Sequence, residues 1–180
     1  MNVSTSQEHK KGTSGPYNFG LITISTSRFQ KYGSVSMPED AEDGSGSIMR
    51  DIIETNGHNV SKYMLVDDST DAIKNSISSA LESDVDIVIT SGGTGLTPQD
   101  VTIESVSPMF EKDIPGFGEL FRYKSIDQIG TAVILTRACA GVIDGKAVFC
   151  LPGSPNAVRL AVQDIIIPEA GHIVRHVCSK

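Results

Sequence analysis

The chain alternates between short apolar runs and longer segments in which apolar residues recur at helical spacing. Continuous runs of apolar and β-branched residues are typical of buried strands, and DIVIT at 86–90 has the character of a central strand covered on both faces. Glycines at positions 141 and 145 predict a turn late in the chain. The pattern predicts strands at 20–25, 60–66, 86–90, 131–136 and 146–151.

Three segments have the spacing of amphipathic helices. The first covers 47–57, the second follows a cap at Ser69 or Thr70, and the third covers 155–166. Strands that alternate with helices are the signature of right-handed crossovers. The expected fold is therefore a three-layer α/β/α sandwich with a mostly parallel sheet.

Ligands of such sheets bind beyond the carboxyl ends of the strands. This rule directs attention to four connections, which are 25–46, 66–70, 91–102 and 151–156.

Length and composition indicate one domain. The chain has 180 residues, of which 39% are hydrophobic, and this is enough for one α/β core but too little for two of ordinary size. Residues 1–17 are polar and have almost nothing to bury, so they predict a flexible tail. We expect the domain to occupy residues 18–180.

The charge balance narrows the range of partners. Lys and Arg total 15 against 22 Asp and Glu, for a net charge of -7, so the chain has no general attraction to nucleic acid or to an anionic membrane. No secretory signal is recognisable, and no apolar run approaches the roughly 18 residues that span a bilayer. We expect a cytoplasmic protein that binds a small molecule or another protein.

The cysteines and histidines form no recognisable metal motif. Cys139, Cys150 and Cys178 contain no CxxC pair, which argues against a disulfide framework and a cysteine zinc site. His172 and His176 have a spacing that can bind zinc, but the catalytic glutamate of an HEXXH motif is absent. A packed or solvated helix is the favoured interpretation.

The loop TSGGTGLTPQD at 90–100 is the first candidate for chemistry. Its backbone N–H groups, with Thr102 as a possible cap of the next helix, can form an anion-binding concavity, although a tight turn without a ligand is the simpler alternative. The loop fits neither GxxxxGK[ST] nor GxGxxG and has no lysine. A bound phosphate must therefore be neutralised by another group.

Aspartates at neighbouring strand ends provide one way to neutralise that charge. Asp100 ends the glycine loop, and Asp67 and Asp68 end the strand before it. Mg²⁺ is commonly held by one or two carboxylates together with phosphate oxygens. Each aspartate alone is more often a cap or turn residue, so the metal site rests on their convergence.

Two further motifs lie later in the chain. In LPGSPN at 151–156, Ser154 is the expected N-cap and Pro155 the first residue of a helix, which is either a second anion site or an ordinary capped helix. In IPGFGEL at 114–120, the proline and glycines predict an elbow that interrupts regular helix.

The ordered set SGGTGLTPQDVT, IPGFGELFR and LPGSPNAV closely resembles the molybdopterin-binding family typified by the MogA and MoaB proteins of molybdenum cofactor synthesis. The resemblance covers roughly residues 18–167. It implies the three-layer fold, assembly into a homotrimer or homohexamer, and work beside other proteins of cofactor synthesis. The implied activity is adenylyl transfer from Mg-ATP to molybdopterin with release of pyrophosphate.

The resemblance also implies site residues. The family's essential aspartates fall on Asp68 and Asp100, which become the expected catalytic and Mg²⁺-binding pair, but Asp67 stands where a proline is expected. The nucleotide- or molybdopterin-binding residues that it implies are Ser25, Asp43, Gly44, Gly46, Ser91, Gly92, Gly93, Thr94, Gly95, Gly116, Glu119, Pro152, Gly153, Ser154 and Pro155.

Three expectations stay open at this point. A carrier or scaffold that binds molybdopterin without transfer is the alternative to an enzyme, although both Asp68 and Asp100 favour the enzyme; an insertase normally has further domains. Composition does not distinguish molybdenum from tungsten. Phe110, Phe121 and Tyr123 near the elbow predict an apolar patch at a subunit boundary.

Overall fold

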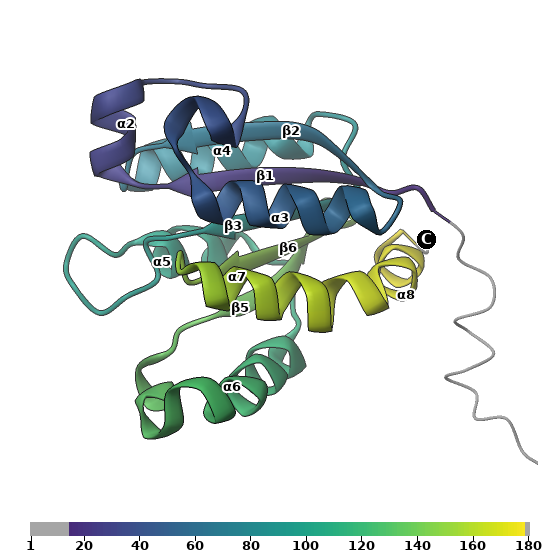
Figure 1. The fold of residues 1–180 in the computed structure, drawn as a ribbon. Coiled ribbons are helices and arrows are strands. Elements are labelled where there is room, and N and C mark those ends of the chain that lie inside the picture. Colours follow the sequence, from purple (N-terminus) through teal and green to yellow (C-terminus); the bar gives the residue numbers. More distant parts are fainter. Residues whose placement is uncertain (1–14, 179–180) are drawn as a thin grey trace, which may run out of the picture.

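A computed structural model describes residues 15–178, and its centre is a single six-stranded sheet (Figure 1). The strands run in the order β2-β1-β3-β6-β5-β4, in which β1, β2, β3 and β6 are parallel while β4 and β5 are antiparallel to their neighbours. The bounds are Asn18–Ile24 (β1), Asn59–Val66 (β2), Ile87–Ser91 (β3), Lys112–Asp113 (β4), Cys139–Ile143 (β5) and Lys146–Leu151 (β6).

Helices cover both faces of the sheet, which makes the fold the expected three-layer α/β sandwich. In Figure 1, α3 and α7 lie in front of the sheet, α4 and α5 lie behind it, and α6 lies below. The helices are α2 (Thr26–Tyr32), α3 (Gly44–Thr55), α4 (Thr70–Leu81), α5 (Thr102–Val106), α6 (Pro115–Ile129), α7 (Pro155–Ala161) and α8 (Ile167–Val177). Short 3₁₀ turns are η1 (Pro38–Ala41), η2 (Ser107–Met109) and η3 (Gly130–Leu135), and a π-helical turn, Val162–Ile166, joins α7 to α8.

Each face of the sheet packs its own apolar cluster. Leu21, Ile89 and Phe149 belong to the cluster under α3 and α7, while Ile22 and Val88 belong to the cluster under α4. Side chains of a strand alternate between the faces, so neighbouring residues of one strand enter opposite clusters. All five residues of β3 are buried, which confirms it as a central strand.

Several helix starts follow the predicted capping chemistry. Ser69 accepts a hydrogen bond from the Ala72 N–H at the start of α4. Ser154 accepts one from the Ala157 N–H, and Pro155 is the first residue of α7. Each cap satisfies an N–H group that has no partner inside its own helix.

The strand predicted at 131–136 is wrong. These residues form most of η3, and Ile134 and Leu135 are 82% and 58% exposed. The strand at this edge is instead β5, which follows directly and forms a hairpin with β6 through Asp144 and Gly145. Both turn residues have positive φ, 49° and 69°, as a two-residue hairpin requires.

The predicted elbow at 114–120 is wrong in a similar way. Pro115 is the first residue of α6, where its missing N–H costs no hydrogen bond, and both glycines are helical. Phe117 is buried and meets Phe149 edge to face, with ring centroids 4.9 Å apart. A Cβ on Gly118 would lie 2.8 Å from the Ala138 carbonyl oxygen, so this glycine permits close packing of α6 on β5.

Most of the predicted tail, residues 1–14, lies outside the described residues. Tyr17, the last residue of that prediction, is half-buried: its N–H donates to Nδ1 of His58 at 3.3 Å, and the two rings lie 5.5 Å apart. No helix between residues 15 and 178 is long and apolar enough to cross a membrane.

Candidate functional site

The glycine loop that follows β3 has a backbone that only glycine adopts readily. Gly92 and Gly93 have φ values of 104° and 60°, in the region that side chains disfavour. A Cβ on Gly92 would lie 2.2 Å from the Ile24 carbonyl oxygen, and one on Gly93 would lie 2.4 Å from Oγ1 of Thr102. The loop therefore lies directly against the end of β1.

Two neighbouring segments hold this loop in place. The Gly92 N–H donates to the Leu151 carbonyl at 3.0 Å, and a Cβ on Gly153 would lie 3.2 Å from the Gly92 Cα. Thr102 is not the cap predicted for the next helix, because it is the first helical residue of α5 and its hydroxyl donates to the Gly92 carbonyl at 2.9 Å. The predicted glycine and LPGSPN loops therefore lie side by side.

A small hollow of about 180 Å³ opens on one side of the glycine loop. At its base Asp43 is only 3% exposed, and its Oδ2 accepts hydrogen bonds from the Thr23 hydroxyl at 2.6 Å and the Tyr63 hydroxyl at 2.9 Å. Burial raises the pKa of the Tyr63 phenol, which keeps it protonated as a donor. The lining residues are Thr23, Ile24, Ser25, Arg28, Asp43, Ser45, Ser91, Gly92 and Gly153.

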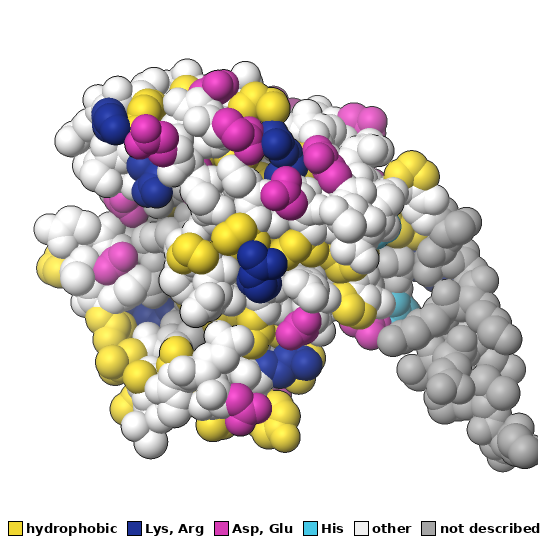
Figure 2. All heavy atoms as spheres, in the orientation of Figure 1, with side chains coloured by type: hydrophobic (Ala, Val, Ile, Leu, Met, Phe, Trp, Pro, Cys, Tyr) yellow, Lys and Arg dark blue, Asp and Glu magenta, His cyan; other side chains and the backbone are white. Residues whose placement is uncertain are grey.

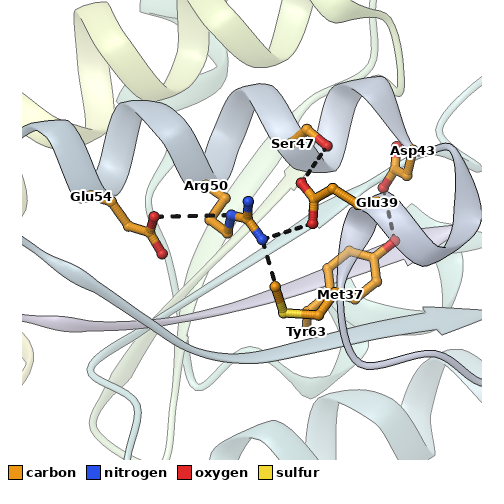
Figure 3. Close-up of polar contacts among 7 residues, drawn as sticks. All are labelled: Met37, Glu39, Asp43, Ser47, Arg50, Glu54 and Tyr63. Atoms are coloured by element: carbon orange, nitrogen blue, oxygen red, sulfur yellow. Dashed lines mark hydrogen bonds and ion pairs between the residues drawn. The ribbon is translucent and has the colours of Figure 1, made fainter.

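The connection before α3 brings the Asp43 carboxylate into this hollow. A Cβ on Gly46 would lie 2.3 Å from Oδ2 of Asp43, so the glycine leaves room for the carboxylate. In Figure 3, Glu39 of η1 is tied to α3 by Ser47 at 2.9 Å and Arg50 at 2.7 Å. The Asp43 N–H also donates to the Pro38 carbonyl, so η1 and α3 together fix where Asp43 lies.

A larger and more open hollow, about 410 Å³, lies on the other side of the loop. Oδ2 of Asp100 accepts from the N–H and hydroxyl of Thr97 at 2.9 and 2.7 Å, and the Thr97 hydroxyl bond is the main reason that the pKa of Asp100 is lowered. The lining residues are Gly92, Gly93, Thr94, Gly95, Asp100, Leu135, Thr136, Arg137, Pro152 and Gly153. The two hollows share Gly92 and Gly153.

Asp68 lies beside the same loop. Its Oδ2 accepts from the N–H and hydroxyl of Thr26 at 2.8 and 3.1 Å, and its Oδ1 lies 2.7 Å from where a Cβ on Gly93 would be. Asp67 also has a buried side-chain oxygen, Oδ1, for which the described residues provide no hydrogen-bond partner. Asp68 and Asp100 therefore both lie beside the glycine loop.

Two arginines were missed by the sequence analysis. Arg28 of α2 lines the small hollow, and Arg137 lines the large one, where it donates to the Gly95 carbonyl at 3.2 Å. Neither arginine belongs to a sequence motif. The only signal in the sequence is position, because Arg28 follows β1 and Arg137 follows η3. They place guanidinium groups in both hollows beside a loop that has no lysine, and Arg137 also forms an ion pair with Glu104 at 2.5 Å.

Some predicted residues lie away from both hollows. Gly116 and Glu119 are exposed on the first turns of α6 and line neither hollow. Ser154 and Pro155 begin α7, where the Ser154 hydroxyl is used as a cap, and they line neither hollow. Gly44 begins α3, and a Cβ added to it would have nothing within 4 Å. Asp68 and Gly46 also line neither hollow, and a role in binding or catalysis for these seven residues stays a prediction.

The residues present fit a Mg²⁺ ion only together with a ligand. Within residues 15–178 no three His, Cys, Asp or Glu side chains converge as a metal site. Asp68 and Asp100 each have their hydrogen bonds on Oδ2. Asp100 lines the large hollow and Asp68 lines neither, so an ion here would need waters and phosphate oxygens as further ligands.

Comparison with known proteins identifies the class of this fold and site. The family described as "Probable molybdopterin binding domain" matches residues 20–172. The chain belongs to this molybdopterin-binding family, as the order of its motifs predicted.

Its relatives are proteins of cofactor biosynthesis. The chain is 41% identical to molybdenum cofactor biosynthesis protein B of Bacillus subtilis over 173 residues, which covers 95% of this chain and 96% of that protein. A crystal structure of a molybdenum cofactor biosynthesis protein B is 39% identical, with a TM-score of 0.80 over 91% of this chain and 98% of the other. The tungsten cofactor synthesizing protein MoaB from Pyrococcus furiosus is 38% identical, with a TM-score of 0.79 over 92% and 99%.

Proposed function

We propose that this protein acts in molybdenum cofactor biosynthesis, as a cytoplasmic enzyme that adenylylates molybdopterin with Mg-ATP. One observation carries the proposal: two hollows of different character meet at Gly92 and Gly153, with carboxylates on both sides. Two substrates bound in adjoining hollows have their reacting groups close together, which is the main requirement of a transfer reaction. The family and the names of the relatives support this choice of substrates.

The reaction joins one phosphate to another. A phosphate oxygen of molybdopterin attacks the α-phosphorus of ATP, a new P–O bond forms, and the bond from that phosphorus to the bridging oxygen breaks, so that pyrophosphate leaves. In the proposed site, N–H groups of the glycine loop and the Arg137 guanidinium hold phosphate oxygens. Asp68 and Asp100 would hold Mg²⁺, which neutralises phosphate charge when bound.

The direct test is to incubate the purified protein with molybdopterin and Mg-ATP and to analyse the products. Adenylylated molybdopterin and pyrophosphate in equal amounts support the enzyme. Binding of molybdopterin with no product would identify a carrier or scaffold instead. Omission of Mg²⁺ is the control, because the proposed carboxylates hold the ion only together with phosphate.

We also propose that the protein is a homotrimer or homohexamer. Figure 2 shows apolar side chains gathered around α6 at the bottom of the view. The residues differ from those predicted, because Phe121 is buried and Phe110 packs against Gly141, while Tyr123 is 73% exposed. The exposed apolar residues of α6 and η3 are Leu120, Tyr123, Ile126, Ile129, Ile134 and Leu135.

An apolar face of this kind is unusual on a soluble monomer, and a rotationally symmetric assembly would cover it. Light scattering should give at least three times the 19.2 kDa chain mass. A monomeric mass would contradict the assembly and leave the transfer reaction untouched.

A further inference from the structure

Two of the three cysteines face each other across the hairpin of β5 and β6. Cys139 pairs directly with Cys150 in the antiparallel register, and directly paired side chains project from the same face of a sheet. Both belong to the apolar cluster under α4, in which Cys150 is fully buried and Cys139 is partly exposed. The two sulfur atoms therefore lie in one small region of the core, which the surface reaches through Cys139.

The third cysteine, Cys178, lies at the other end of this hairpin. It is exposed, and its Sγ donates to the carbonyl of Gly145 in the turn at 3.7 Å. Gly145 and Cys150 are five positions apart along an extended strand, a separation on the order of 15 Å. Cys178 is therefore too far away to form a bond with either member of the pair.

The spacing of the pair permits a disulfide without movement of the backbone. Directly opposed residues of antiparallel strands have Cα atoms about 4.5–5.5 Å apart, and disulfides join Cα atoms about 4.4–6.8 Å apart. The register is fixed by the two-residue turn, since Ile143 pairs with Lys146 and the pairing continues without interruption to Cys139 and Cys150.

The two thiols differ in the way that stepwise oxidation requires. Contact with the Cys150 thiol lowers the pKa of the partly exposed Cys139, and the thiolate is the form that attacks an oxidant. Contact with Cys139, followed by burial, raises the pKa of Cys150, which stays a thiol. An accessible cysteine of lowered pKa beside a second cysteine is the arrangement typical of redox-sensing thiols.

A buried hydroxyl lies next to the second thiol. Thr90 of β3 is fully buried and pairs in register with Cys150 of β6. Its Oγ1 has no hydrogen-bond partner among residues 15–178, although buried polar groups ordinarily have one. A hydroxyl in this position can donate to the Cys150 sulfur as that sulfur loses its proton, which favours the ionised form.

We propose that Cys139 and Cys150 are a redox-active pair, which a peroxide converts into a disulfide across β5 and β6 and a small thiol reduces again. The Cys139 thiolate attacks one oxygen of hydrogen peroxide and the O–O bond breaks, which gives a sulfenic acid and hydroxide. The Cys150 sulfur then attacks the Cys139 sulfur, an S–S bond forms, and the S–O bond breaks with release of water. The two thiols lose two electrons and two protons, and the peroxide becomes two molecules of water.

The pair lies close to the large hollow along both strands. Arg137, which lines the hollow, comes two residues before Cys139, and Pro152, which also lines it, comes two residues after Cys150. Neither cysteine lines either hollow. Substitution of a cysteine therefore leaves the residues of the proposed transfer site in place, and the redox test does not depend on the transfer reaction.

The test uses the variant Cys178→Ser, in which the pair provides the only thiols of the chain. The folded protein is treated with hydrogen peroxide and analysed by mass spectrometry. The intact chain should lose two hydrogen atoms and both titratable thiols, peptide mapping should place the bond between residues 139 and 150, and dithiothreitol should restore both thiols.

Two further variants of this protein separate the steps. With Cys150→Ala added, oxidation should stop at a sulfenic acid on Cys139, which dimedone labels. With Cys139→Ser added, the buried Cys150 thiol should survive the same treatment unlabelled. Circular dichroism checks the fold of each variant, and Cys139→Ser, which changes a partly exposed residue, keeps the test readable if Cys150→Ala does not fold.

Several results would overturn the proposal. One is retention of both thiols in the folded protein under peroxide that fully oxidises glutathione in the same solution. Others are a disulfide that forms only in urea, a disulfide that joins two chains, and oxidation of Cys139 to a sulfinic acid without a bond to Cys150. Dimedone labelling of Cys150 in the variant that lacks Cys139 would refute the assigned order of reaction.

Discussion

The two hollows hold their carboxylates in different ways. Asp43 is buried and takes its hydrogen bonds from Thr23 of β1 and Tyr63 of β2, so the sheet itself positions it. Asp100 is partly exposed and takes its hydrogen bonds from Thr97, three residues earlier in the same loop. A group fixed by tertiary packing is coupled to stability, whereas a group fixed within its own loop can change with little effect on the rest of the domain.

The largest expected effect belongs to the loop that separates the hollows. Gly92→Ala should destabilise the domain by about 3 kcal/mol or more and abolish transfer, because the residue needs a positive φ and its Cβ would meet the Ile24 carbonyl. Urea denaturation and the transfer assay measure the two effects. Gly57→Ala is the matched control, since Gly57 also has a positive φ, 81°, but nothing lies within 4 Å of its added Cβ; it should lose only about 1–2 kcal/mol and keep transfer.

Asp100→Asn should leave the fold intact and reduce transfer at least about 100-fold, because an isosteric amide removes the charge that holds Mg²⁺ and phosphate. The melting temperature should stay within the wild-type range, and Asp71→Asn, on the exposed side of α4, provides the control for loss of one charge. Transfer at the wild-type rate would remove Asp100 from the mechanism.

Tyr63→Phe, in contrast to Asp100→Asn, should reduce stability more clearly than it reduces transfer. Loss of a buried hydroxyl that donates to a carboxylate should lower the free energy of unfolding by about 1–2 kcal/mol, and the change is measurable by urea denaturation. Thr23 still holds Oδ2 of Asp43, so transfer should fall less than for Asp100→Asn. If stability is unchanged, the contrast between the two carboxylates is wrong.

The smallest effect is a displacement of the pH profile. The Thr97 hydroxyl stabilises ionised Asp100 and lowers its pKa, so transfer that needs the carboxylate should persist to lower pH than for an ordinary aspartate. Thr97→Val removes this bond and raises the pKa, so transfer should begin to fall at a higher pH as the solution is acidified. Overlapping profiles of the two proteins would show that Asp100 does not set the acidic limb.

The parallel half of the sheet was predictable because its pattern is strong. DIVIT is apolar on both faces, and the observed strand β3 is buried throughout. The run TAVILT has the same local pattern, yet it forms an exposed 3₁₀ turn, while CAGVI at 139–143 forms the strand. Local pattern cannot decide between two neighbouring apolar runs when hairpin pairing with β6 selects only one of them.

The site was predictable only where the backbone conformation requires a particular residue type, such as glycine. Gly92 and Gly93 are required by positive φ and close contact, so a glycine cluster after a strand identifies the loop. Arg28 and Arg137 were missed because an arginine has no backbone signature, and its contribution appears only when folding brings it to the loop. Asp43 came from the resemblance, since its partners Thr23 and Tyr63 are distant in sequence.

The strand order also constrains how the protein is made. Loops that line the two hollows follow β1, β3 and β6, and β3 pairs with β6, which is not complete until residue 151. While the chain is being synthesised, β1 finds both of its neighbours, β2 and β3, before β6 is made, whereas β3 has one edge unpaired until then. A chain that ends before β6 lacks Gly153, which lines both hollows, so a ligand of the hollows can stabilise only a chain that includes this strand and the loop after it.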